Sequence, residues 1–361
     1  MKKTLTALLL IGTLYSYAQQ DPYFTHFKDV MQVYNPAAAG KHSGEICLSG
    51  LTHHQWRDFD DQTQVRGAEG DPLHINTNPD IEDVAPVTYN LNVETIWKLL
   101  KKDSSWKLGT GLTIVDDKVS YSKGTTVMAN INVKKELQGG FSEISAGFGV
   151  GMTQWGFDKP DFKARQQNDP KVPVSGGNQS KLDLNFGAMY KQKRLGPLKN
   201  FFSGISVTNV NGAKYIVPVS TAGGQTSLQR HFVPHYYTIA GADYPLNGNL
   251  VLEPAILGKY MPVASGSGTS YVPQFDLNVT ALYASTFRGG IAYRQYGNAD
   301  AASVLMGYIK GALEVGYAYD ITLSNLQRVS NGTHEIIVKY CIPIVTKPPP
   351  PPIIRLTPRF L

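Results

Sequence analysis

Two motifs in this chain have residue types that suggest metal or phosphate chemistry, and their spacing argues against both. His53 and His54 are adjacent, and neighbouring residues of a β-strand point to opposite faces, so they cannot chelate one ion as a pair. Glycines alternate through residues 147–151 but lack the following helix that a phosphate-binding loop requires. We predict that these glycines face inward and leave room there, and we predict no cofactor.

An acidic cluster is a weak candidate for a divalent ion. Asp58, Asp60 and Asp61 lie close together, but they supply too few spaced ligands for an EF-hand loop. They belong either to a solvated rim or to a contact with an ion or a partner. No nucleophile set of the Ser/His/Asp type is recognisable, so we predict no catalytic residue and a function other than catalysis.

The two cysteines could form a covalent link. Cys47 lies near the start of the first predicted strand and Cys341 near the end of the last. If the strands close into a barrel, these two strands pair antiparallel and both sulfurs face the lumen near one rim. An oxidising compartment permits a disulfide there, although the stagger between strands could separate the sulfurs. A disulfide and two free thiols both remain possible.

The elements that would position these residues are β-strands. From Leu313 to Ile321 every second residue is apolar or aromatic, and the alternation resumes from Ile336 to Ile342. Such a period of two indicates strands with one apolar face. The other face is small, amidic or charged on nearly every segment, which is typical of a transmembrane β-barrel.

We predict about fourteen strands in an antiparallel up-and-down barrel covering residues 44–344. Their expected ranges are 45–56, 84–97, 105–115, 125–137, 142–155, 181–192, 200–210, 232–244, 249–261, 271–283, 287–296, 301–309, 312–322 and 333–342. The connections alternate between long and short, with long ones expected at 57–83, 116–124, 156–180, 211–231 and 262–270. Outer-membrane barrels show this alternation because their periplasmic turns are short and their outer loops long.

Composition agrees with a barrel in the outer membrane. Charged residues make up only 17% of the 361 residues and aromatic residues 11%, whereas about 25% charged is usual in soluble domains. Residues 1–18 have a basic start, an apolar stretch and small residues before the expected cut, as in a signal peptide. Removing Lys2 and Lys3 with it lowers the net charge of +6 by two, which is too little to indicate a nucleic-acid partner.

The two ends of the mature chain differ from the strands. Residues 19–43 are rich in aromatic side chains, so we predict that they pack into the periplasmic mouth or lumen of the barrel; a disordered leader is the alternative. Residues 345–361 contain five consecutive prolines, which form a stiff spacer. The even strand count places both mature termini in the periplasm. We predict that the tail and the basic short turns contact periplasmic components.

Several motifs together resemble the PorP/SprF family of the type IX secretion system of Bacteroidetes. They are Asp21-Pro22-Tyr23-Phe24, Tyr34-Asn35-Pro36-Ala37, Gln55-Trp56, the segment from Glu253 to Tyr260, Gly316-Tyr317-Ala318-Tyr319-Asp320 and Gly332-Thr333-His334-Glu335-Ile336. No single motif is decisive, but their order and spacing are specific. From these segments we predict that partner contacts include Tyr23, Phe24, Asn35, Pro36, Gln55, Trp56 and Arg57.

The resemblance implies a non-enzymatic integral outer-membrane barrel that helps export or anchor a secreted surface protein. Its client would be adhesin-like and carry a type IX C-terminal targeting domain, and its other partners would be secretion components. The long acidic first loop and the proline tail depart from the family pattern. The alternative is a porin or transporter for small solutes, because about fourteen strands leave room for a pore.

Overall fold

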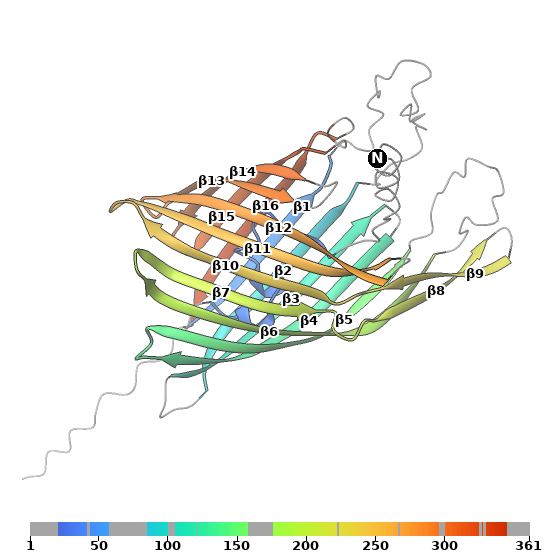
Figure 1. Cartoon of the computed structure of the whole chain (residues 1–361), viewed down its shortest axis with the longest axis horizontal. Helices are drawn as coiled ribbons and strands as arrows, with labels where there is room; N and C mark the ends of the chain where they lie inside the picture. The colour runs from blue at the N-terminus through green and yellow to red at the C-terminus, as the bar shows by residue number, and fades with distance from the viewer. Residues whose placement is uncertain are drawn as a thin grey trace, which may run out of the picture.

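The strands of the chain close into one antiparallel barrel. The computed structural model describes residues 21–41, 44–57, 85–99, 105–120, 122–157, 176–221, 224–265, 268–295, 300–324, 327 and 330–344. The expected signal peptide, the cluster of Asp58, Asp60 and Asp61, and the proline-rich tail therefore lie outside the described residues. Fourteen strands form the barrel in the order β1-β16-β15-β14-β13-β12-β11-β10-β7-β6-β5-β4-β3-β2, and β8 and β9 form a separate two-stranded sheet (Figure 1). The predicted fold class is confirmed.

The strand bounds follow the alternation seen in the sequence. They are β1 Glu45–His54, β2 Val87–Lys98, β3 Trp106–Val119, β4 Ser122–Leu137, β5 Ser142–Phe157, β6 Gly177–Leu195, β7 Leu198–Thr208, β8 Lys214–Thr221, β9 Gly224–His231, β10 His235–Pro245, β11 Leu250–Ser265, β12 Gly268–Tyr283, β13 Phe287–Gln295, β14 Ala301–Lys310, β15 Leu313–Thr322 and β16 Thr333–Pro343. Two short 3-10 helices, η2 Met31–Val33 and η3 Pro36–Ala38, precede them. No helix among the described residues is long and apolar enough to cross a membrane.

The two faces of the wall have opposite character. Outward side chains are large, apolar and exposed, as at Ile131, Phe186 and Ile291, because lipid is their solvent. Inward side chains are polar and buried, as at Asn130 and Asn132. The inward glycines at 147, 149 and 151 face the N-terminal segment or neighbouring strands, so the predicted orientation of this run is confirmed.

The two ends of the barrel differ in the connections between their strands. We call one the short-turn end, where residues 138–141, 196–197, 246–249, 284–286 and 311–312 join the strands, and the opposite one the loop end. In the left-handed region, Gly311 has a φ of 60°, which suits a tight turn. Strand length varies round the barrel: β5 and β12 have 16 residues each, whereas β13, which pairs with β12, has 9.

Two connections expected to be long are mostly strand. β3 continues to Val119 and β4 begins at Ser122, while β11 continues to Ser265 and β12 begins at Gly268. The expected loops at 116–124 and 262–270 are therefore wrong. Most of their residues are polar or small, so hydropathy alternation does not reveal these strands, but they pair in register, as Asp116 does with Thr125. The wall thus projects beyond its apolar band on this side.

The expected loop at 211–231 is also wrong, because it folds as the hairpin β8–β9. Tyr215 and Val217 bury against Trp155 of β5, and the Tyr215 hydroxyl donates to the carbonyl of Thr153 at 2.9 Å. The alternation in β8 is too short to stand out in sequence. The hairpin extends the wall beside β6 and projects from the loop end (Figure 1).

Candidate functional site

The N-terminal segment fills the lumen. Residues 21–41 contact thirteen of the fourteen barrel strands through hydrogen bonds, ring contacts or close packing. Its aromatic and aliphatic side chains form the core of the molecule: Phe24, Phe27, Val30, Met31, Tyr34, Ala37 and Ala38 pack with Leu51, Met189, Tyr237, Ile239 and Leu257 of the wall. Full burial of one such large side chain stabilises the packed state by about 1.5–3 kcal/mol.

The segment passes through the barrel and is not confined to one mouth. Asp21 lies beside His235, the first residue of β10 at the loop end, with 3.5 Å between a carboxylate oxygen and Nδ1. Asp29 lies near the short-turn end, and Lys339 of β16 contacts it there. The prediction of a packed mouth or lumen is confirmed, and the lumen is filled to a greater depth than a mouth alone.

A single buried carboxylate fixes the first turn of the segment. Glu335 of β16 is 0% exposed and accepts from the backbone N–H groups of Thr25 at 2.9 Å and His26 at 2.7 Å. Its two oxygens also contact Nδ1 of His26 at 2.7 Å and Nδ1 of His53 at 2.8 Å. A buried carboxylate needs such partners to offset its desolvation. Glu335 therefore joins the segment to two adjacent strands.

A buried guanidinium extends this network. Arg294 of β13 donates to Asp276 at 2.6 Å, to Asp320 at 2.8 Å and to the Thr25 hydroxyl at 3.0 Å. The guanidinium also lies 4.0 Å from the ring centroid of Tyr23, a cation–π geometry. Thr25 in turn donates to Asp320 at 2.9 Å.

A third group of charges lies toward the short-turn end. Lys339 bridges Asp29 at 2.5 Å and Glu314 at 2.6 Å, and Lys28 contacts Glu253 at 2.9 Å. Burial of Asp29 acts to raise the pKa of its carboxyl, but the surrounding positive charges of Lys339, Arg288 and Lys41 together outweigh it and hold that pKa well below its usual range. Asp29 is therefore a charged anchor of the segment at neutral pH.

Asn35 and Pro36 enter gaps that glycines leave in the wall. The Asn35 side chain caps η3 by accepting from the N–H of Ala37 at 2.9 Å, as an N-cap residue does. Its amide nitrogen donates to the carbonyls of Ala188 on β6 and Ile205 on β7 at 3.2 and 3.1 Å. A Cβ at Gly187 would lie 2.0 Å from the Asn35 oxygen. Only glycine allows this approach.

Amide and hydroxyl side chains hold the rest of this half. Asn132 donates to the carbonyls of Pro36 and Ala39 at 3.0 and 2.8 Å. The Lys134 ammonium donates to the carbonyl of Gly40 at 2.8 Å. Backbone carbonyls of the segment, which have no strand partner, thereby gain donor partners as buried polar groups require.

The residues predicted to bind a partner lie in the N-terminal segment or at the nearby rim, where they make contacts within the chain. Phe24 and Asn35 are almost fully buried, and Pro36 lies against the wall near Gly187. The Gln55 side chain donates to the Tyr23 hydroxyl. Two rim residues bond to the start of β16: the Trp56 N–H donates to the Thr333 hydroxyl at 3.1 Å, and the Arg57 N–H donates to the Gly332 carbonyl at 2.8 Å.

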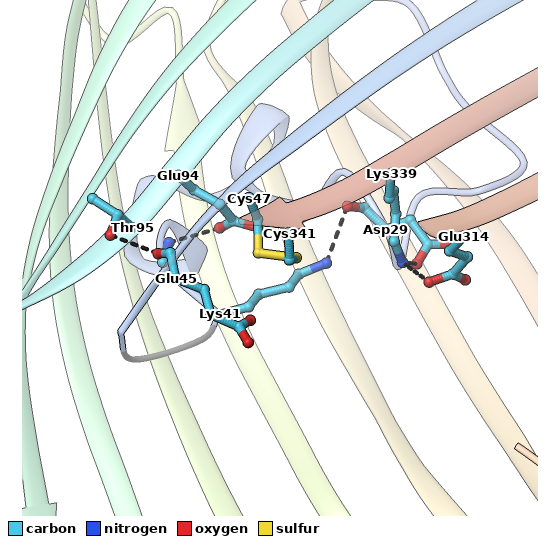
Figure 2. Close-up of a disulfide and its surroundings, with 10 residues drawn as sticks. Asp29, Lys41, Glu45, Cys47, Glu94, Thr95, Glu314, Lys339 and Cys341 are labelled. Atoms are coloured by element: carbon cyan, nitrogen blue, oxygen red, sulfur yellow. Dashed lines mark hydrogen bonds and ion pairs between the residues drawn. A yellow bond between two sulfur atoms is a disulfide. The ribbon is translucent and has the colours of Figure 1, made fainter. Parts of the chain in front are cut away.

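Cys47 and Cys341 are directly opposite each other on β1 and β16 and form a disulfide with an S–S distance of 2.07 Å. Figure 2 shows the bond beside Lys41, whose ammonium donates to the carbonyl of Asp29 at 3.0 Å. Among the described residues, Glu45 with the two cysteines forms a group of metal-ligating types. Metals bind thiolates, and here the sulfurs are bonded to each other.

The buried charges were not singled out as site residues in the sequence. Glu335, Arg294, Asp276 and Asp320 occupy inward positions of strands that were predicted from the sequence. A signal was present, because a charged residue on the inward face needs a partner inside the barrel. Among the described residues of the short turns and nearby strand ends, the exposed basic ones are Lys98, Lys193, Arg194, Lys199 and Lys310.

Comparison with known proteins gives one family match and a set of barrels. A family model described as "Type IX secretion system membrane protein PorP/SprF" matches residues 16–340. Comparison with curated protein sequences finds no significant match. A FadL homologue of Pseudomonas aeruginosa is 12% identical with a TM-score of 0.51, over 86% of this chain and 93% of that one. This likeness shows the fold alone.

Two further solved structures are less similar. The toluene transporter TodX of Pseudomonas putida is 11% identical with a TM-score of 0.44, over 87% of this chain and 92% of that one. The translocator domain of the autotransporter NalP of Neisseria meningitidis is 11% identical with a TM-score of 0.43, over 88% and 96%.

Proposed function

Because the chain belongs to the PorP/SprF family of type IX secretion system membrane proteins, we propose that it is a non-enzymatic outer-membrane barrel that binds a secreted surface protein. The client is an adhesin-type protein carrying a type IX C-terminal targeting domain, which the barrel helps to export or anchor at the cell surface. The short-turn end faces the periplasm, as in outer-membrane barrels generally.

The filled lumen is the observation that carries this proposal. The segment is fastened on all sides by buried hydrogen bonds and ion pairs, such as those at Glu335 and Asn35. Removing it would leave these polar groups unpaired, which costs about 1–3 kcal/mol for each neutral group. A barrel filled in this way offers its rims and loops to partners and is poorly suited to continuous conduction of solutes.

The two rims supply different partner surfaces. At the loop end the β8–β9 hairpin presents Ile216, which is half exposed, to the client. At the short-turn end the exposed basic residues, including Lys193 and Arg194, face acidic periplasmic components of the secretion system. Opposite charge on a partner speeds encounter and sets specificity. The proline-rich tail is a further contact for such components.

The test is purification of the tagged barrel from native outer membrane, followed by identification of co-purifying proteins. We expect a secreted protein with a type IX C-terminal domain. Ile216→Glu at the loop end should reduce client recovery several-fold. Leu246→Glu, which alters an equally exposed apolar residue of the short-turn end, is the matched control and should not.

The porin alternative makes the opposite prediction. A purified porin would show a steady large conductance in single-channel recordings, with no client bound. Such a recording, together with the absence of any secreted protein in the pull-down, would overturn the proposed function.

A further inference from the structure

The outer face of the barrel carries a groove that the proposed function does not use. It has a volume of about 1070 Å³ and extends from Trp106 on β3 to Phe275 on β12. The residues that form it include outward, lipid-facing positions, such as Ile205, which is 63% exposed. A large hollow on this face is unusual for a barrel wall, because outward positions normally carry bulky apolar side chains.

The strand register explains the course of the groove. One row of opposed outward residues runs Val133, Ala146, Ala188, Ile205, Thr238, Gly258 and Phe275 across seven neighbouring strands. The adjacent row runs Trp106, Lys135, Ile144, Tyr190, Ser203, Ala240 and Ile256. The groove therefore follows two hydrogen-bonded rows at right angles to the strands.

Small side chains form its floor. Ala146, Ala188, Ser203, Ala240 and Gly258 occupy outward positions in the two rows. At Gly258 even a Cβ would lie 2.5 Å from the Thr238 hydroxyl, so the floor is low here. Bulky residues of the same rows form the sides. The hollow thus results from side-chain size at defined register positions.

The dimensions select an alkyl chain as the occupant. Each row spans six interstrand steps of about 4.8 Å and is therefore about 29 Å long. One leaflet of the hydrocarbon core is about 15 Å thick, half of about 30 Å, so the groove is long enough to hold an acyl chain of that leaflet. The two rows are about 7 Å apart, and a helix with its side chains is about 10–12 Å wide. An acyl chain fits the floor, and a transmembrane helix of a partner does not.

The groove has a cationic end. The Lys135 ammonium lies 4.6 Å from the ring centroid of Trp106 and donates to the Ser105 hydroxyl at 2.6 Å, so it is held at the short-turn end of the groove. Tryptophan beside lysine is typical of the membrane interface, where lipid phosphates lie. The charge therefore lies where a phosphate headgroup would be, at the end of an apolar path.

We propose that this groove is a binding site for one glycerophospholipid, with an acyl chain along the two rows and the phosphate at Lys135. The choice of a glycerophospholipid over lipid A rests on the orientation proposed above, because the short-turn end then lies in the periplasmic leaflet. The bound lipid completes the wall where its side chains are smallest.

The experiment is native mass spectrometry of the barrel purified from native membrane and washed extensively in detergent. The wild-type protein should retain one glycerophospholipid. Ala188→Phe fills the floor and should lower occupancy more than tenfold. The control is Ala302→Phe, at an outward position of β14 outside the groove, and should retain the lipid.

A second pair of variants tests the headgroup contact. Lys135→Gln should lower occupancy about fivefold, which corresponds to about 1 kcal/mol for a lysine near an anionic headgroup. Lys310→Gln changes an exposed lysine at the short-turn end of β14 and should have no effect.

Several outcomes would overturn the proposal without touching the proposed client binding, because none of these variants alters the loop-end surface around Ile216 that is assigned to the client. They are retention of lipid A in place of glycerophospholipid, a wild-type barrel that carries no lipid after washing, and equal occupancy in Ala188→Phe and Ala302→Phe.

Discussion

The two halves of the barrel wall hold the N-terminal segment by different means. Strands β11–β16, the charged half, bind residues 25–29 through ionised side chains such as Glu335 and Lys339. Strands β2–β7, the amide half, bind residues 32–40 mainly through neutral groups and close backbone approach at glycines.

This difference has consequences for how the segment could be released. Hydrogen bonds to charged groups contribute about 1.5–3 kcal/mol each, roughly twice the contribution of neutral ones. The charged half therefore relies on a few strong contacts, and loss of one carboxylate frees several groups at once. The amide half relies on many weaker contacts and close packing, so the loss of any one contact should weaken the binding of the segment only slightly.

The largest expected effect comes from breaking the charged half at its centre. Glu335→Leu leaves two buried N–H groups and two histidines without their acceptor. We expect a loss of about 3–5 kcal/mol, as for a buried charge pair that loses one partner. Urea unfolding of the barrel in lipid vesicles measures it, and limited proteolysis reports exposure of residues 21–41.

The matched control for this variant is Glu143→Leu. Glu143 lies 3.9 Å from Lys191 and both side chains are partly exposed, so the loss should stay below about 1 kcal/mol. Equal losses in the two variants would show that the buried network has no special part in holding the segment.

The next effect concerns the covalent link between β1 and β16. Replacing both cysteines, Cys47→Ser with Cys341→Ser, should lower the free energy of unfolding by about 2–4 kcal/mol, chiefly because the unfolded chain is no longer constrained. The comparison of the two halves predicts that the segment stays bound. Increased proteolysis of residues 21–41 in the native state of this variant would contradict that expectation.

A smaller effect is expected in the amide half. Gly147→Val places a Cβ where it would lie 2.4 Å from the backbone nitrogen of Ala37, and overpacking costs about 1–3 kcal/mol. Gly289→Val is the control, since the nearest atom to its Cβ would be 4.0 Å away. The difference between the unfolding free energies of the two variants measures the effect of crowding between residue 147 and Ala37. A difference of zero would show that the wall moves to accommodate the larger side chain.

The smallest effect is at the rim, away from both sets of contacts. Lys107 and Glu136 form a partly exposed ion pair at 2.5 Å, and such pairs contribute about 0.2–1 kcal/mol. Lys107→Gln should therefore change the unfolding free energy by less than about 1 kcal/mol, and the change should shrink at high salt. A larger loss would place this pair among the anchors of the segment.

Much of the fold follows from local sequence pattern. The alternation from Leu313 to Ile321 predicts a strand with lipid on one side, and the structure has β15 there. The aromatic residues before Asn35 predict burial, because side chains such as Phe24 and Phe27 are costly to leave in water. These conclusions need only the two-residue alternation of apolar side chains and the number of apolar residues in a segment.

The remainder depends on pairings between distant parts of the chain. Thr25 meets Asp320 and Glu335 from the other end of the sequence, and no local pattern shows which inward acid accepts from which donor. The polar extensions near Asp116 and the short hairpin strand with Tyr215 were missed for a related reason, since strand pairing outside lipid leaves no hydropathy signal.

The disulfide between Cys47 and Cys341 links the first and last strands of the barrel covalently. In a barrel without such a bond, the first and last strands could separate and release a polypeptide from the lumen laterally into the bilayer. In this molecule the disulfide keeps the first and last strands together at the short-turn end for as long as the sulfurs remain joined. A polypeptide that entered the lumen from that end would have to travel along the axis, where residues 21–41 occupy the path.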